Sequence, residues 1–390
     1  MVVGTDADRV LEQAVAAGEV PGVVALAADD GGVIYEGAFG TRTLGQDAPM
    51  TPDTVCWIAS MTKAITSVAA MQLVEQGKLS LDEPLGTLLP ALAAPQVLEG
   101  FAADGAPRLR PARRPITLRL LLSHTAGFCY SIWNAEMLRY EQQAGLPSIV
   151  ECKDAAIQLP LVFDPGERWE YGINIDWAGK AVEAASGQRL EGYLRANIFG
   201  PLGMNDSGFV LGAAQRERLA GMHARNPDGS LAVIPFEIPQ EPEFYMGGGG
   251  LYSTGRDYLA FLQMLLHGGS FNGAQILRPE TVAEMARNQI GDLGVGLLKT
   301  AIPASSNDAE FFPGMPKKWG LGYMITTEEA STGRSAGSVA WAGLANTYYW
   351  LDPAKRLAGV ILTQILPFAD AAVLGLFDRF ERAIYAGRNT

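Results

Sequence analysis

The order of apolar and polar positions at the start of the chain predicts a helix followed by a β-hairpin. Apolar residues recur at helical spacing after Asp6, which we expect to cap the helix, and Gly18 ends it. Apolar runs over 23–28 and 33–39 then predict two strands, joined by an Asp-Asp-Gly-Gly turn at 29–32. The chain is therefore expected to open with a helix and two antiparallel strands.

The end of the chain repeats this material in reverse order. Strand-like runs over 337–344, 347–351 and 357–363 precede a helical pattern over 370–386. Antiparallel strands from both ends can build one sheet, and the two terminal helices can cover it. We expect both ends to contribute to a single domain.

The middle of the chain has a helical pattern broken by loops rich in Pro and Gly. Its periodic runs cover 61–76, 116–123, 150–158 and 174–186. The pattern predicts an α/β (α+β) protein in which residues 1–59 and 235–390 form a discontinuous sheet domain. Residues 60–234 would form a mainly helical domain, with the active site in the cleft between the two.

Composition narrows the classes of partner. The 390 residues are 48% hydrophobic and 18% charged, which excludes a disordered chain, and their net charge is −12. Such a field repels nucleic-acid phosphates and anionic lipid. The most apolar stretch, 357–377, contains Gln364, Pro367 and Asp370 and is too polar to cross a bilayer. We expect a small-molecule substrate and no nucleic-acid or membrane partner, while the oligomeric state is left open.

The N-terminus and the cysteines favour the cytoplasm. The first ten residues have no basic segment followed by an apolar one, as a secretory signal would. Three scattered cysteines without a Cys-x-x-Cys pair are typical of a reduced compartment. His124, His223 and His267 form no metal-binding pattern, so no metal and no cofactor are expected.

Three further motifs are interpreted as structural. The Gly-x-Ser-x-Gly sequence at 333–337 has no histidine after it, so it lacks the base of an α/β-hydrolase. The four glycines at 247–250 lack the Lys-Ser/Thr of a phosphate loop and are expected to let the backbone cross the active-site floor. The basic cluster at 108–114 is expected to be a solvated loop, and His124 a buried structural residue.

Catalytic chemistry is indicated at the start of the helix predicted over 61–76. In Ser60-Met61-Thr62-Lys63 the serine and the lysine are three residues apart and share a helix face. The helix N-terminus favours a developing oxyanion, and a partly desolvated lysine can accept the serine proton. The spacing alone also fits an ordinary helix-capping serine.

A tyrosine about 110 residues later adds a possible third catalytic group. Residues 164–171 form a turn that delivers Tyr171 just before a helix. A cationic lysine beside a phenol can lower its pKa, so Tyr171 could act as a general base beside Ser60 and Lys63. A buried tyrosine at a turn is the alternative.

Five segments occur in the order seen in serine β-lactamase-like proteins. They are Ser60-x-x-Lys63, Leu121-Leu122-Ser123-His124-Thr125-Ala126-Gly127, Pro165-Gly166-x-x-Trp169-x-Tyr171, Gly247-Gly248-Gly249-Gly250-Leu251-Tyr252-Ser253-Thr254 and Trp341-Ala342-Gly343. The chain resembles family VIII carboxylesterases most, with class C β-lactamases and D-alanyl-D-alanine peptidases as relatives. The resemblance implies a serine β-lactamase-like fold, an antiparallel sheet flanked by helices plus a mainly helical lobe.

Two departures from the lactamase pattern favour esters. Lactamases of this group carry Lys-Thr-Gly where this chain has Trp341-Ala342-Gly343, and an indole cannot pair with a substrate carboxylate. After Tyr171 the chain has Gly172-Ile173, so Asn174 lies one place later than in the lactamase Tyr-x-Asn motif. We expect Trp341, Ala342 and Gly343 to contact a neutral substrate.

The resemblance also implies an oxyanion hole made by the backbone N–H groups of Ser60 and Leu344. The aromatic segment 128–140 could wall an acyl pocket, with Phe128, Tyr130 and Trp133 as substrate contacts.

The function hypothesis is a serine carboxylesterase that hydrolyses short-chain neutral esters through an acyl-Ser60 intermediate, with Lys63 and Tyr171 as general base. Three alternatives remain open. They are a β-lactamase or D-Ala-D-Ala peptidase, an acyltransferase of the same fold, and a non-enzymatic acyl sensor or binding module.

Overall fold

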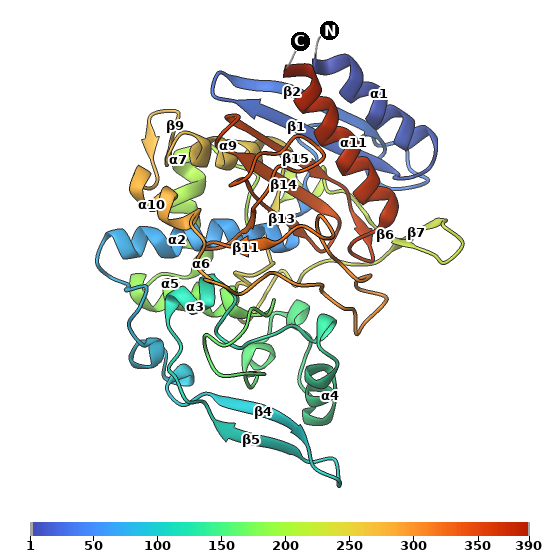
Figure 1. The fold of residues 1–390 in the computed structure, drawn as a ribbon. Helices are drawn as coiled ribbons and strands as arrows, with labels where there is room; N and C mark the ends of the chain where they lie inside the picture. The colour runs from blue at the N-terminus through green and yellow to red at the C-terminus, as the bar shows by residue number, and fades with distance from the viewer. Residues whose placement is uncertain (1–2, 389–390) are drawn as a thin grey trace.

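A computed structural model describes residues 3–388 and places strands from both chain ends in one seven-stranded antiparallel sheet (Figure 1). The strand order is β11-β12-β13-β14-β15-β1-β2. The strands are β1 (Gly22–Asp29), β2 (Gly32–Gly40), β11 (Lys317–Trp319), β12 (Met324–Thr326), β13 (Val339–Gly343), β14 (Thr347–Asp352) and β15 (Leu357–Leu362). The N-terminal hairpin and the three C-terminal strands are thus confirmed.

Helices cover both faces of the sheet. The helices α1 (Val3–Ala16) and α11 (Ala371–Arg388) pack side by side on one face (Figure 1), and α9 (Gly255–Leu266) packs on β1 and β15. Neighbouring residues of β14 point to opposite faces, as a strand requires. Trp350 contacts Phe377 of α11, while Tyr349 contacts Tyr258 of α9. The mixed fold of an antiparallel sheet and helices, expected from the sequence, is confirmed.

The expected cap of the first helix is wrong. Asp6 lies inside the first turn of α1, where its carboxylate accepts a hydrogen bond of 3.1 Å from Arg9. A capping residue stands at the end of a helix, whereas α1 already includes the three residues before Asp6.

The central part of the chain contains most of the remaining helices. They are α2 (Thr62–Glu75), α3 (Leu118–Leu122), α4 (Ala135–Ala144), α5 (Asn174–Ser186), α6 (Leu190–Leu194), α7 (Gly200–Leu202), α8 (Ala213–Arg216) and, beyond it, α10 (Pro279–Met285). The helix α2 is buried from Thr62 to Leu73 and packs on α5. The predicted helix over 150–158 is wrong, since two short 3₁₀ turns flank Cys152, whose φ of +52° ends the first of them.

Short strands occur between these helices. They are β3 (Cys56–Trp57), β4 (Gln96–Phe101), β5 (Pro107–Pro111), β6 (Met222–Arg225), β7 (Leu231–Ile234), β8 (Tyr252–Ser253), β9 (Ser270–Phe271), β10 (Ala274–Gln275) and β16 (Ile365–Leu366).

The basic cluster at 108–114 is not simply a loop. Residues 107–111 pair with β4 as a strand. Arg110 binds Asp164 at 2.8 Å and Glu99 at 2.7 Å, which attaches this strand to the protein.

The division of the chain into a sheet domain and a helical domain, at residues 59/60 and 234/235, stays a prediction.

The three cysteines, Cys56, Cys129 and Cys152, are buried free thiols. Within residues 3–388, none of the helices combines the length and the apolar character needed to cross a membrane.

Candidate active site

Ser60 lies in a 3₁₀ turn, Ala59–Met61, that leads directly into α2. The residue before it, Ala59, has a φ of +45°, in the left-handed region that residues with a side chain rarely adopt. Met61 rather than Ser60 occupies the cap position of α2. The ordinary capping role left open by the sequence therefore does not apply, and the serine side chain stands at the positive end of the helix.

Lys63 is fully buried and points its ammonium at three acceptors. Its Nζ lies 3.1 Å from the Ser60 Oγ, 3.0 Å from the Tyr130 hydroxyl and 2.6 Å from the Gly248 carbonyl oxygen. Burial lowers the pKa of Lys63, and the negative charge of Asp176 opposes this change. A lysine with a lowered pKa has a neutral form near physiological pH, which can accept the serine proton.

Asp176 is a buried acid that the sequence reasoning missed. Its Oδ1 accepts a 2.8 Å hydrogen bond from the Gly248 N–H, and its Oδ2 accepts one of 3.3 Å from the Tyr130 hydroxyl. Burial raises the pKa of Asp176, and the charge of Lys63 opposes the rise. The sequence signal for a buried acid was the position of Asp176 between Ile175 and Trp177, in the first turn of a buried helix.

The glycine run passes between these side chains, as expected from the sequence. The Gly247 carbonyl accepts a bond from Thr66, and the Gly249 carbonyl accepts one from Trp57. A Cβ on Gly248 would lie only 2.5 Å from the Asp176 Oδ2. Only glycine lets the backbone supply both a carbonyl to Lys63 and an N–H to Asp176.

Tyr171 accepts a hydrogen bond from Trp341 beside Lys63. The Trp341 Nε1 donates to its hydroxyl oxygen at 2.8 Å. The Lys63 Nζ lies 4.7 Å from the centre of the phenol ring. Burial raises the pKa of Tyr171, against the opposing effects of Ser60 and Trp341. The expected lowering of this pKa by the lysine is therefore wrong, and the phenol is protonated at rest.

His124 holds the segment that carries Tyr171. Its Nδ1 accepts a 3.4 Å bond from the Gly172 N–H and lies 3.0 Å from the Asn174 Nδ2. Its ring lies 4.8 Å from the Tyr171 ring, and burial lowers its pKa. This is the buried structural histidine expected from the sequence. Asn174 bonds His124 and the Phe128 carbonyl.

The aromatic residues of the segment 128–140 do not all line the cavity beside Ser60. Trp133 and Tyr130 line the small cavity beside Ser60, together with apolar side chains such as Ile132, Val150 and Met246. Phe128 does not line that cavity. It is buried against Trp177 with ring centres 6.3 Å apart, so its expected role as a substrate contact stays a prediction.

The strand β13 brings the expected oxyanion residues together. Leu344 follows this strand and lines the same cavity as Ser60. A Cβ on Gly343 would lie 2.2 Å from the Ile58 carbonyl oxygen, so glycine permits the close approach of β13 to the Ser60 turn. Ala342 is buried within β13. Among the described residues, no cluster of His, Cys, Asp or Glu could hold a metal ion.

Comparisons with known proteins show which proteins this chain is similar to. The family model described as Beta-lactamase matches residues 7–381. Monacolin J acid methylbutanoyltransferase of Aspergillus terreus is 35% identical, over 97% of this chain and 95% of its own. Lovastatin esterase of Penicillium rubens is 33% identical, over 97% of both chains.

Solved structures agree with this likeness. Unliganded simvastatin synthase (LovD) from Aspergillus terreus, in its selenomethionyl form, superposes with a TM-score of 0.86 at 33% identity over 97% of both chains. EstCE1, a hydrolase with promiscuous acyltransferase activity, has a TM-score of 0.76 at 24% identity over 97% of both chains, which shows the shared fold.

Proposed function

The chain belongs to the β-lactamase family and has the fold of its serine enzymes, and we propose that it is a carboxylesterase that cleaves neutral esters through an acyl-Ser60 intermediate. One observation carries the proposal. The buried Lys63 Nζ lies 3.1 Å from the Ser60 Oγ and 4.7 Å from the centre of the Tyr171 ring. A nucleophile with a base and an acid beside it is the arrangement that acyl transfer requires.

In the acylation step, neutral Lys63 accepts the Ser60 proton while the Oγ forms a bond to the ester carbonyl carbon. The negative charge that develops on the carbonyl oxygen is stabilised by the backbone N–H groups of Ser60 and Leu344. Both residues line the same cavity, at the positive end of α2.

The protonated Tyr171 then acts as the acid. Its O–H gives its proton to the leaving alkoxide as the ester C–O bond breaks, and a phenolate forms. The Trp341 N–H donates to that oxygen at 2.8 Å, and the newly formed Lys63 ammonium lies under the ring at 4.7 Å. Both contacts favour the phenolate.

Deacylation reverses the proton transfers. The Tyr171 phenolate takes a proton from water, whose oxygen attacks the acyl carbon. The bond to the Ser60 Oγ breaks, and Lys63 returns its proton to that oxygen. Water is consumed, a carboxylic acid is released, and all three side chains regain their starting protonation states.

The surroundings of Ser60 and Tyr171 favour uncharged substrates. Trp341 occupies the position where lactamases of the resembled group place a carboxylate-binding lysine, and its N–H is engaged by Tyr171. The wall beside Ser60 is made of apolar and aromatic side chains, among them Trp57, Ile149 and Val150. These features support assignment to the family VIII carboxylesterase branch.

An acyltransferase is a second candidate, favoured by the relative that is named a methylbutanoyltransferase. It would use the same acylation step and pass the acyl group to an alcohol. An apolar site supports this alternative, because it disfavours water as the acceptor.

The test uses p-nitrophenyl esters of increasing acyl length beside a chromogenic cephalosporin, with Ser60→Ala as the control. We expect turnover of short-chain esters that falls at least ~10³-fold in the variant, and little cephalosporin turnover. Added 1-propanol separates the candidates, since a transferase makes the propyl ester and a hydrolase the free acid. Turnover retained in Ser60→Ala, or a burst without turnover, would overturn the proposal.

A further inference from the structure

A second cavity lies behind Trp341, at the edge of the sheet. Its volume is about 560 Å³, within the range of small-molecule sites. It is bounded by β12, β13 and β14, the first half of α11, the segment 331–334 and the loop that carries Phe311 and Met315. The residues that line it and those that line the Ser60 cavity do not overlap.

The walls of this cavity are mostly apolar. Phe311, Met315, Met324, Leu374 and Phe377 come from three separate segments and line the same space. A large apolar cavity that can admit solvent is costly unless an apolar ligand occupies it. The body of a ligand here would therefore be apolar.

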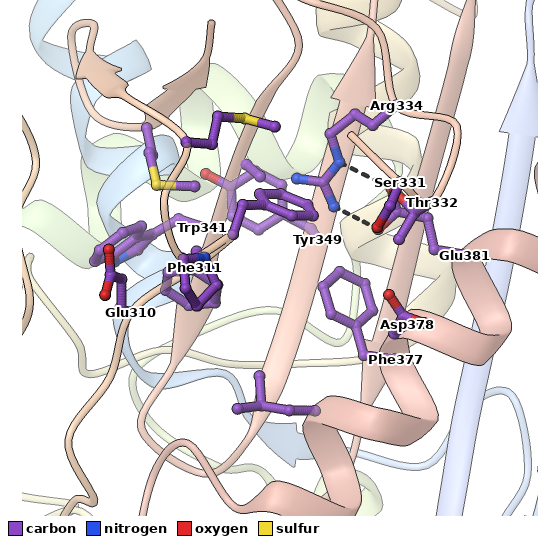
Figure 2. A pocket seen from close by; sticks show the side chains of 16 residues that line it. Glu310, Phe311, Ser331, Thr332, Arg334, Trp341, Tyr349, Phe377, Asp378 and Glu381 are labelled. Carbon is purple, nitrogen blue, oxygen red and sulfur yellow. Dashed lines mark hydrogen bonds and ion pairs between the residues drawn. The ribbon is translucent and has the colours of Figure 1, made fainter. Parts of the chain in front are cut away.

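One polar group is directed into the cavity. Arg334 is 1% exposed and binds Glu381 through Nε at 2.9 Å and through Nη2 at 2.5 Å. Figure 2 shows its third nitrogen, Nη1, pointing away from Glu381 toward the side where Trp341 and Tyr349 lie. Among the interactions of residues 3–388, no hydrogen bond engages this Nη1. It is a free donor at the cavity wall.

The charges around the cavity are already paired. Glu381 neutralises Arg334 and also accepts a bond from Thr332, and Glu310 pairs with Lys317 at 3.2 Å. Asp378 pairs with a neighbouring arginine on α11. A charged ligand would lack a free counter-ion, whereas a carbonyl oxygen can accept from Nη1 without one.

We propose that this cavity is a second ligand site, distinct from the Ser60 cavity, for a neutral and largely apolar small molecule with a carbonyl-type acceptor. Trp341 lines it and also donates to Tyr171, so a ligand there contacts the residue that orients the catalytic phenol. Its occupancy therefore changes the rate of the chemical step without competing with the ester.

Benzophenone is a suitable probe, because it is neutral and apolar, has one carbonyl acceptor, and on irradiation inserts into nearby C–H bonds. We expect saturable labelling of peptides that contain Met315, Met324 or Leu374, mapped by mass spectrometry. Ser60→Ala should be labelled equally, since the site does not need the nucleophile. This readout does not depend on ester turnover, so it stands apart from the proposed function.

Two filling variants supply the control. Leu374→Trp and Met315→Trp each place an indole in the cavity from a different segment, so one tests the site if the other fails to fold. Either should reduce saturable labelling at least tenfold. With p-nitrophenyl butyrate, benzophenone should change kcat at least twofold in the wild type and leave KM within twofold.

Several results would overturn the second site. They are labelling only at the Ser60 cavity, labelling that does not saturate, and competitive kinetics in which KM rises at constant kcat. Saturable labelling with an unchanged kcat would overturn the link to Tyr171.

Discussion

The indole Nε1 of Trp341 donates a hydrogen bond of 2.8 Å to the hydroxyl oxygen of Tyr171. The two residues are 170 positions apart and come from β13 and from the turn before α5. The sequence predicts Trp341 as a substrate contact at the position of a carboxylate-binding lysine. In the structure its indole N–H binds the Tyr171 hydroxyl instead, so in the proposed mechanism Trp341 positions the phenol.

Trp341→Phe is therefore expected to slow the chemical step more than it weakens substrate binding. It removes the donor that favours the Tyr171 phenolate, and a hydrogen bond to a charged group contributes about 1.5–3 kcal/mol. We expect kcat for p-nitrophenyl butyrate to fall roughly 10- to 100-fold with KM within twofold. Trp350→Phe is the matched control, since Trp350 is buried under α11, away from Tyr171. A larger effect on KM than on kcat would contradict the positioning role.

The two tyrosines beside Lys63 should differ in importance. Tyr171→Phe removes the acid that protonates the leaving alkoxide, so kcat should fall by ~10²- to 10⁴-fold. Tyr130→Phe removes a 3.0 Å partner of the Lys63 Nζ and a 3.3 Å donor to Asp176, and should cost about tenfold. Steady-state kinetics on both variants checks the order. Equal losses, or a greater loss for Tyr130→Phe, would reverse the assignment of the acid.

Gly343→Ala should lower both stability and activity. Its Cβ would lie 2.2 Å from the Ile58 carbonyl oxygen, so β13 must move away from the Ser60 turn and take Leu344 with it. Overpacking of this kind costs roughly 1–3 kcal/mol. Gly192→Ala in α6 is the control, because a Cβ there meets nothing within 4 Å. We expect thermal unfolding to show a lower Tm for the first variant only, together with a loss of kcat/KM.

Local sequence patterns were enough to predict five of the seven strands of the sheet and to single out Ser60, Lys63 and Tyr171, which the structure brings together. Ser60 and Lys63 are joined by helix geometry, and the motif before α5 brings Tyr171 to the site. The roles of Tyr130 and Asp176 depend on contacts between segments far apart in the chain, which periodicity does not encode. The burial of Phe128 against Trp177 was likewise not predictable, since an aromatic residue on a loop can face a cavity or the core with the same local pattern.

The pH dependence tests the buried pair of Lys63 and Asp176. Because neutral Lys63 is the base, kcat/KM should fall as the pH drops through the lowered pKa of this lysine. The charge of Asp176 favours the protonated lysine, so Asp176→Asn should lower the pKa of Lys63 further. The acid limb of the profile should then move to lower pH by about one unit. Asp257→Asn is the matched control, because burial also raises the pKa of Asp257, to about 6, while its carboxylate bonds Ser207 and not Lys63. An acid limb that moves to higher pH in Asp176→Asn, or that moves equally in the control, would show that Lys63 is not the titrating base.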